Sequence, residues 1–310
     1  MEMTKIEKVI KDNSKELNVN HKDAIRLRIP KTYKLFIGGK FPRTESGRYF
    51  KVTNKKNGKM VANMCQASRK DFREAVLAAR KSWKNWSGQN AFTRGQIIYR
   101  IGEMLDGRRS QFIEELIVQG YSSKKADAEV DLALDRIIYY AGWADKYQQI
   151  FSSVNPVSSS HFNFSVCEST GVIAAIAPED YGLTGMVSTI IPLLAGGNTV
   201  VVLAPEKASM AGITLGEVIN TSDVPSGVVN ILTGNVKELV THFATHMDVN
   251  AIFYGGNDPR IISKIQKGAT SNLKRVLIYP KTEWEDAESQ DPYFIMDTQE
   301  IKTIWHPVGF

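Results

Sequence analysis

Cysteine is scarce in this sequence of 310 residues, which contains only Cys65 and Cys167. Two cysteines are too few for a disulfide framework, which favours a reducing compartment, and we expect the protein to be cytoplasmic. The chain has no uninterrupted apolar run of about 18 residues, so neither a transmembrane helix nor a membrane partner is expected. Its first residues also lack the apolar stretch of a signal peptide.

Several catalytic motifs are absent as well. The sequence has no Walker loop, no serine nucleophile elbow and no Gly-x-Gly-x-x-Gly motif. Neither cysteine lies at a strand-to-helix turn, where a thiolate would be stabilised, so we interpret both as structural residues. His242 and His246 are spaced so that one helix face would carry both imidazoles, the arrangement of a shared metal. Phe243 stands where the zinc-protease motif has its glutamate, and we therefore expect no metal site.

The net charge of +6 is unevenly distributed. Residues 1–60 carry a balance of +10, whereas residues 61–310 carry −4. One interpretation is a basic arm for nucleic acid or an acidic partner. The other is a solvated leader over residues 1–33, in which lysines alternate with acidic residues. No aromatic side chain interrupts the first 32 residues, as a single-strand binder would require, so we expect no nucleic-acid partner.

The pattern over residues 34–147 predicts short strands followed by helices. The turn at Asn57-Gly58 indicates a hairpin. Ser68 is a plausible N-cap for a first helix, which carries apolar residues at spacings of three and four. Two further amphipathic stretches run from about Thr93 to Gly120 and from Ser122 to Trp143. We interpret their spaced aromatic residues as core packing.

The strongest pattern is a series of five short apolar runs that alternate with four helices. This alternation is typical of a Rossmann-like, doubly wound parallel α/β sheet, here preceded by N-terminal helices. Ligands bind such sheets beyond the carboxyl ends of the strands. The predicted strands are 171–177, 199–203, 228–232, 250–254 and 274–279, and their carboxyl ends lie near Pro178, Leu203, Gly234, Gly255 and Tyr279.

Gly255-Gly256 lies between a predicted strand and a predicted helix. These glycines would let an anion approach the N–H groups of the helix. They would equally suit a tight turn with no ligand. The sequence leaves both interpretations open.

A hairpin is predicted at 148–167, outside the parallel series. Phe162, Phe164 and Val166 alternate with polar residues, which indicates a strand with one apolar face. A second alternating strand, Ile301–Trp305, needs a partner. We expect the hairpin and this strand to form a small separate β-sheet.

Several of these segments resemble the aldehyde dehydrogenase superfamily, from about Leu35 to the last residue. The resemblance is carried by Leu-Phe-Ile-Gly-Gly-Lys (35–40), Leu-Ala-Gly-Gly-Asn-Thr-Val-Val-Val (194–202), Pro-Ser-Gly-Val-Val-Asn-Ile-Leu-Thr-Gly (225–234), Met-Asp-Val-Asn-Ala-Ile-Phe (247–253) and Ile-Lys-Thr-Ile-Trp-His-Pro (301–307).

The resemblance implies a division of the chain and a cofactor. Residues 34–147 and 168–285 would form the cofactor-binding domain, and 148–167 with 296–310 would form the oligomerisation arm. The implied cofactor is NAD or NADP. The residues that would bind it are Pro178, Gly234, Gly255 and Gly256.

Several chemical positions depart from the family pattern. The family's Pro-Trp-Asn-Phe turn, whose Asn holds the substrate oxygen, reads Pro-Glu-Asp-Tyr at 178–181, and an ionised Asp180 would repel a developing oxyanion. The ribose-binding Lys and Glu are replaced by Ala204 and Lys207, with Glu206 one residue out of register. Arg260 replaces a glycine, where it either crowds the helix start or pairs with a phosphate. Tyr279 stands in place of the general-base glutamate.

The family's catalytic cysteine lies in a domain between the fifth strand and the terminal strand. Here only residues 280–295 occupy that interval, and they include no cysteine. A domain needs about 50 residues or more. Without the thiolate, this chain alone is not expected to oxidise aldehydes. The surface which that domain would cover is expected to be apolar and to find a partner.

Two functions follow as hypotheses. The first is an oligomerising binding or scaffold subunit without its own catalytic activity, assembled as a homo-oligomer or with a full-length aldehyde dehydrogenase. The alternative is an NAD(P)-binding oxidoreductase subunit that acts on aldehydes within a complex.

Overall fold

The computed structural model describes residues 30–309. Most of the predicted 1–33 leader lies outside these residues. The prediction of a leader is wrong for its last residues, because Lys31–Tyr33 form strand β1, which pairs in parallel with β3 (Met60–Cys65). Strand β2 (Tyr49–Thr53) pairs with β3 on its other side, across the predicted turn at Asn57-Gly58. The described fold therefore includes residues before the predicted boundary.

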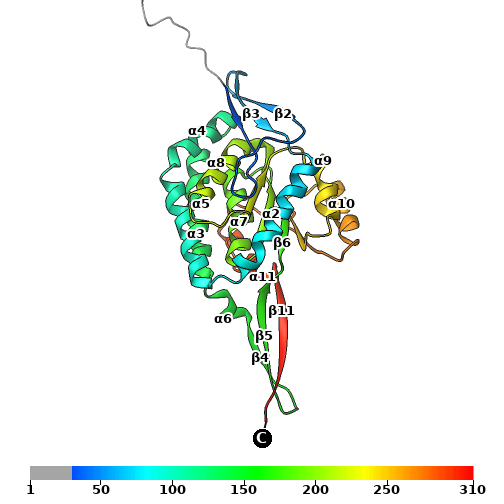
Figure 1. Cartoon of the computed structure of the whole chain (residues 1–310). Helices are drawn as coiled ribbons and strands as arrows, with labels where there is room; N and C mark the ends of the chain where they lie inside the picture. The colour runs from blue at the N-terminus through cyan, green and yellow to red at the C-terminus, as the bar shows by residue number, and fades with distance from the viewer. Residues whose placement is uncertain (1–29, 310) are drawn as a thin grey trace, which may run out of the picture. The chain divides into compact units, whose positions relative to one another are not determined.

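Four helices follow this small sheet. Helix α2 (Arg69–Ser87) begins at Ser68, whose side chain accepts the N–H of Asp71 while the Asp71 carboxylate accepts the N–H of Ser68. Helices α3 (Ala91–Asp106), α4 (Arg109–Gln119) and α5 (Ser123–Trp143) pack beside one another (Figure 1). The single stretch predicted from Thr93 to Gly120 is thus two helices. Leu105 and Phe112 are both buried in one core, so the apolar period continues across the break.

The predicted parallel sheet is confirmed, with the strand order β10-β9-β6-β7-β8. Its strands are β6 (Val172–Ile176), β7 (Thr199–Leu203), β8 (Val229–Leu232), β9 (Ala251–Tyr254) and β10 (Arg275–Ile278). The helices between them are α7 (Gly182–Ala195), α8 (Ser209–Asn220), α9 (Val236–Thr245) and α10 (Pro259–Ala269), with a short 3-10 helix η1 (Glu206–Ala208) before α8.

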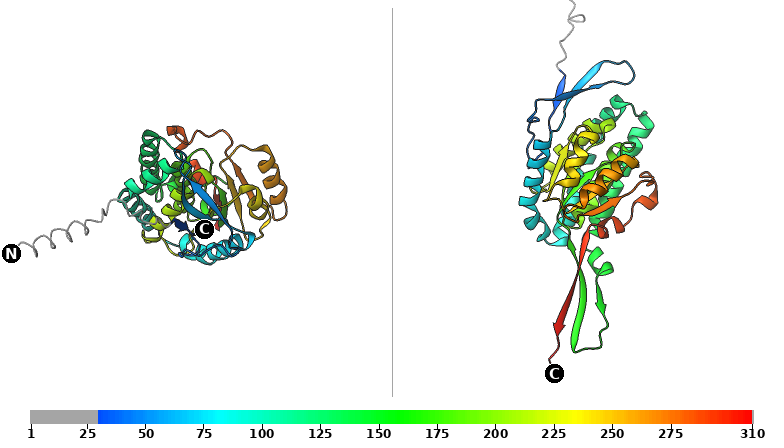
Figure 2. Two further views of the ribbon diagram at one scale, coloured as in Figure 1. Left: turned by 90° about the horizontal axis from the view of Figure 1, so that it is seen from above. Right: turned by 90° about the vertical axis from the view of Figure 1, so that its right-hand side faces the viewer.

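Helices cover both faces of this sheet. Ile173 and Ala175 of β6 belong to the core shared with α7, α8 and the α3–α5 group. Val172, Ala174 and Ile176 alternate with them and pack with α2, α9 and α10. Figures 1 and 2 show this layered arrangement. The chain order reverses between β6 and β9, so the crevice beyond these two strands is where a doubly wound sheet binds ligands.

The second predicted sheet is also present and projects from the main body (Figure 2, right). After the short helix α6 (Tyr147–Phe151), strands β4 (Ser153–Asn155) and β5 (His161–Ser169) form the hairpin. Strand β11 (Gln299–Pro307) pairs antiparallel with β5 and completes the order β11-β5-β4. We call these three strands the arm.

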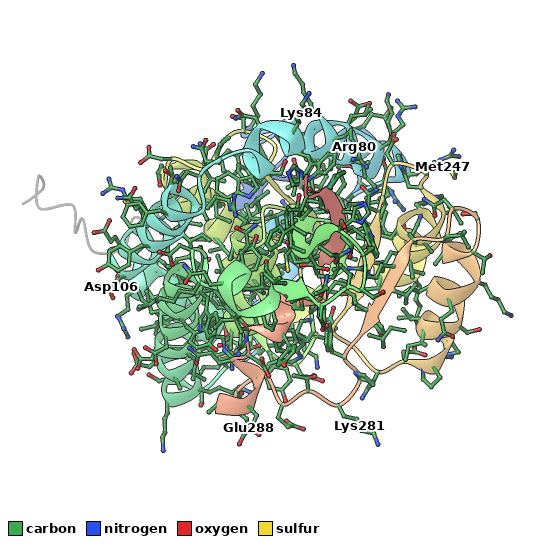
Figure 3. All side chains as sticks on the ribbon, turned by 90° about the horizontal axis from the view of Figure 1, so that it is seen from below. Arg80, Lys84, Asp106, Met247, Lys281 and Glu288 are labelled. Atoms are coloured by element: carbon green, nitrogen blue, oxygen red, sulfur yellow. The ribbon has the colours of Figure 1, made fainter. Side chains whose placement is uncertain are left out.

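Residues 280–298 connect β10 to the arm through a 3-10 helix, η2 (Ala287–Ser289), and helix α11 (Tyr293–Met296). Trp284 is 1% exposed and packs with Phe294 and Tyr279 against Phe253 of the sheet. The expectation of a bare apolar face here is therefore wrong at the end of β10, because this segment covers it. Figure 3 shows Lys281 and Glu288 of the same segment at the periphery, away from Arg80 and Lys84 of α2.

None of the helices in residues 30–309 is long and apolar enough to cross a membrane.

Candidate functional site

A groove of about 520 Å³ lies beyond the carboxyl ends of β6, β9 and β10. It brings together the predicted residues Pro178, Asp180, Gly255, Gly256 and Tyr279. Gly234 does not line it. With φ of +152°, Gly234 turns the chain after β8, and a Cβ there would lie 3.2 Å from the Ala67 backbone nitrogen. Its neighbour Asn235 lines the groove instead.

The two glycines lie in the connection between β9 and α10 and pack closely against neighbouring atoms. The Gly255 N–H donates to the carbonyl of Ile176, and a Cβ on Gly255 would lie 2.8 Å from Cδ of Pro178. A Cβ on Gly256 would lie 2.5 Å from the hydroxyl oxygen of Tyr254. Contacts this short exclude a larger side chain. Close packing against Pro178 and Tyr254 therefore accounts for both glycines without a ligand.

The helix N-termini beside the groove accept side chains from the chain itself. The Asp258 carboxylate accepts the N–H of Arg260 at the start of α10, and Asn235 accepts the N–H of Lys237 at the start of α9. At α7, the buried Glu129 carboxylate accepts the N–H of Thr184. A helix N-terminus favours an anion. Here an acceptor of the protein already takes that position at each of these three helices.

Arg260 neither crowds the helix start nor faces the groove. Its side chain is 82% exposed, and its guanidinium pairs with the Asp258 carboxylate at 3.3 Å. This contact lowers the pKa of Asp258, which keeps a negative charge at the mouth of the groove.

Two carboxylates follow β6 and contact the residues that follow β7. Both oxygens of Glu179 lie 3.1 Å from the backbone nitrogen of Glu206, which donates to them. Burial raises the pKa of Glu179. The next residue, Asp180, accepts from the Lys207 ammonium at 2.5 Å, which raises the pKa of Lys207. Asp180, at the family's oxyanion position, and Lys207, at its ribose-binding position, thus form an ion pair.

The register of the two strands accounts for this pairing. Ile176 and Leu203 are register partners at the ends of the adjacent parallel strands β6 and β7. Glu179 and Glu206 each lie three residues beyond these partners, and Asp180 and Lys207 each lie four residues beyond them. Equal offsets on adjacent parallel strands place side chains side by side.

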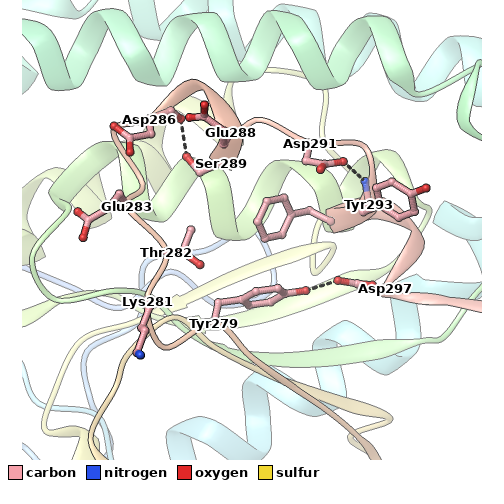
Figure 4. Close-up of a pocket in the computed structure, with 11 residues that line it drawn as sticks. Tyr279, Lys281, Thr282, Glu283, Asp286, Glu288, Ser289, Asp291, Tyr293 and Asp297 are labelled. Atoms are coloured by element: carbon pink, nitrogen blue, oxygen red, sulfur yellow. Dashed lines mark hydrogen bonds between the residues drawn. The ribbon is translucent and has the colours of Figure 1, made fainter.

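Tyr279 does not offer a base to the groove. Its hydroxyl donates to the Asp297 carboxylate at 2.5 Å (Figure 4). Burial, with the nearby Asp297, raises the pKa of the phenol, so it stays protonated at neutral pH. The cavity drawn in Figure 4 has a volume of about 490 Å³ and lies within residues 279–297, between Tyr279 and the η2–α11 segment.

The remaining candidates lie elsewhere. Cys65 and Cys167 are buried free thiols, and burial raises the pKa of each. His246 Nδ1 accepts the N–H of Asp248, and burial lowers the pKa of both His242 and His246. No group of three or more metal-ligating side chains is found within residues 30–309.

Comparison with known proteins identifies the family. Residues 41–279 match the aldehyde dehydrogenase family, and this match ends where β10 ends. The chain belongs to the aldehyde dehydrogenase family. It is 30% identical over 247 residues to an aldehyde dehydrogenase of Aspergillus niger, a match covering 79% of this chain and 49% of the relative. It is 31% identical to retinal dehydrogenase 2 of Mus musculus, with 79% and 48% covered.

Solved aldehyde dehydrogenases share the fold. The NAD+ complex of the Bacillus cereus enzyme superposes with a TM-score of 0.75 at 24% identity and covers 80% of this chain and 50% of its own. The betaine aldehyde dehydrogenase of Staphylococcus aureus, also solved with NAD+, gives 0.75 at 22% identity, with 79% and 49% covered. The chain thus spans about half the length of the curated relatives it matches.

The groove residues of this family member do not fit a nicotinamide dinucleotide. The lining contains five carboxylates against two lysines: Glu179, Asp180, Glu206, Asp258 and Glu283, with Lys237 and Lys281. The diphosphate of a dinucleotide would bring further negative charge into this lining, and like charges repel at short range. Lys207, the cation nearest to Asp180, is already paired.

Proposed function

We propose that this aldehyde dehydrogenase family member is a binding or scaffold subunit that assembles through its arm and does not itself catalyse aldehyde oxidation. The observation that carries the proposal is the amphipathic character of the arm. Such a sheet is stable when its apolar face is covered, and an uncovered face of this kind usually marks an interaction surface.

The register of the arm places four of its apolar side chains on one face. Val154, Phe164 and Ile304 are opposite one another on the three strands, and opposed residues of antiparallel strands share a face. Phe162, two residues from Phe164, lies on the same face and packs on it with ring centroids 5.4 Å apart. Val154 is 66% exposed, Phe162 46% and Ile304 40%.

The opposite face of the arm carries an internally bonded polar cluster, together with Ile301 and Trp305, which are 45% and 57% exposed. The Asn155 amide donates to Asn163 at 2.6 Å, and the hydroxyls of Ser165 and Thr303 lie 2.9 Å apart. These contacts satisfy polar groups within the sheet and fix its register. We propose that the face with Val154, Phe164 and Ile304 binds a partner, which is a second copy of this chain or a full-length aldehyde dehydrogenase.

The altered chemical positions support a role without catalysis. Asp180 presents a charge where an oxyanion would need a donor. Tyr279 donates a hydrogen bond to Asp297, and residues 280–295 supply no thiol. The charges of the groove disfavour the alternative of an NAD(P)-binding subunit. The buried free thiols of Cys65 and Cys167 are consistent with a reducing compartment, and we propose the cytoplasm.

Light scattering coupled to size exclusion tests the assembly. The purified protein should elute with a mass at least twice 34.6 kDa, or co-elute with a co-expressed full-length aldehyde dehydrogenase. A monomer over the whole accessible concentration range, with no co-elution, would overturn the proposal.

A further inference from the structure

We infer that Glu179 and Asp180 close the groove of this chain to dinucleotides by tying the loop after β6 to the loop after β7. The inference concerns what the groove admits, and so goes beyond the proposed role in assembly. It rests on the register, contacts and charges of consecutive residues in these two loops.

The two contacts act on adjacent positions. Glu179 receives the N–H of Glu206, and Asp180 receives the ammonium of Lys207. Because β6 and β7 are hydrogen-bonded neighbours that end in register, the loops that follow them start side by side, and these contacts join them. They hold the loops together beside the switch point between β6 and β9, where an α/β sheet binds nucleotides.

The same contacts set the charge of the groove. Glu179 and Asp180 place two consecutive carboxylates on the wall of the groove, and Asp180 also forms an ion pair with the ammonium group of Lys207. A diphosphate would meet these carboxylates and would find this cation already paired. On the opposite wall, Asp258 holds the first free N–H of α10. The groove thus has an internal anion at Lys207 and at the start of α10, two of the places where a phosphate would find a donor.

Replacing Glu179 and Asp180 by neutral residues of the same shape distinguishes the effect of their charge from that of their shape. In Glu179→Gln, the side-chain oxygen still accepts the N–H of Glu206. In Asp180→Asn, the Lys207 ammonium is released toward solvent and an incoming phosphate. The double variant E179Q/D180N therefore removes two negative charges and frees one positive charge without adding a heavy atom.

Titration with NADH, followed by its fluorescence, and calorimetry with NAD+ and NADP+ test the inference on the full chain. The wild-type protein should show no saturable binding up to about 1 mM cofactor. The E179Q/D180N variant should bind with a dissociation constant at least about tenfold below that concentration. The matched control E103Q/D106N removes two carboxylates from α3 that do not line the groove, and it should behave as the wild type.

Submillimolar binding by the wild-type protein would overturn the inference, as would a folded double variant that binds no better than the control. If E179Q/D180N does not fold, as judged by circular dichroism, D180N alone carries the test, because it frees Lys207. Light scattering on the same samples reports the assembly separately, so a failure of this inference is distinguishable from a failure of the proposed function.

Discussion

Arg136 holds Trp284 in place: its Nη2 donates to the backbone carbonyl of Trp284 at 2.6 Å. The same guanidinium donates to the carbonyls of Asp286 and Ser289. Arg136 is 1% exposed, and no carboxylate pairs with it within residues 30–309. A buried cation thus binds residues 284–289 to α5 through backbone carbonyls and the hydroxyl of Ser289.

Replacing Arg136 should release residues 284–289 from α5. Arg136→Ala leaves several buried carbonyls without a donor, and the free energy of unfolding should fall by about 3 kcal/mol. Arg136→Lys keeps the charge with fewer donors and should cost about half as much. Urea unfolding measures the loss, and limited proteolysis should cut within 280–298 faster in Arg136→Ala. Equal cleavage rates in all three proteins would contradict this role.

The apolar face of the arm should determine the assembly state. Phe162→Ser with Ile304→Ser removes two exposed apolar side chains from one face, and the mass measured by light scattering should fall to that of a monomer. Leu77→Ser with Met247→Ser is the matched control, since both side chains are exposed but lie outside the arm. An unchanged mass in the arm variant, or a fall in the control, argues against the arm as the interface.

The turn at Gly255 should tolerate no side chain. Gly255→Ala forces a Cβ to within 2.8 Å of Pro178, and we expect a loss of about 2 kcal/mol in the free energy of unfolding. Gly107→Ala is the control, because its Cβ would lie no closer than 3.6 Å to any atom. That change should be neutral or slightly stabilising. Equal stabilities of the two variants would mean that the turn adapts.

Lys274 should make stability depend on pH in the alkaline range. Burial lowers the pKa of Lys274 to about 8, although its ammonium still donates to the carbonyl of His246. Between this value and the unfolded pKa of about 10.4, the unfolded chain binds more protons, so stability rises with pH. Each pH unit in this window should add about 1 kcal/mol to the free energy of unfolding.

Urea unfolding at pH 7.5, 8.5 and 9.5 measures this slope. Lys274→Met should lose the contribution, whereas Lys264→Met on the exposed face of α10 should keep it. Parallel pH profiles for the wild type and Lys274→Met would refute the assignment.

Much of the fold was predictable because burial leaves a clear pattern. Strands buried on both faces, such as Val172–Ile176 and Thr199–Leu203, read as continuous apolar runs. Strand β1 left no such pattern, since Lys31 and Thr32 are polar and the strand has only three residues. The boundary between α3 and α4 was hidden because both helices pack on one core.

The site was less predictable than the fold. The departures at Asp180 and Tyr279 were visible as substitutions, but their contacts were not. Lys207 was visible only as a replacement, and its partner lies 27 residues away in the sequence. Tyr279 finds Asp297 in a segment with no regular apolar pattern. Such contacts depend on how loops fold back over the sheet, which local periodicity does not encode.

Strand β11 pairs with β5 at nine register positions, although the whole parallel sheet lies between them in the chain. During synthesis, β5 therefore leaves the ribosome long before β11, with which it pairs along one edge. During that interval β5 has a free edge beside Phe162 and Phe164, and such edges readily pair with other chains. We therefore expect a translational pause after β10 to prolong this interval, and rapid delivery of β11 to shorten it.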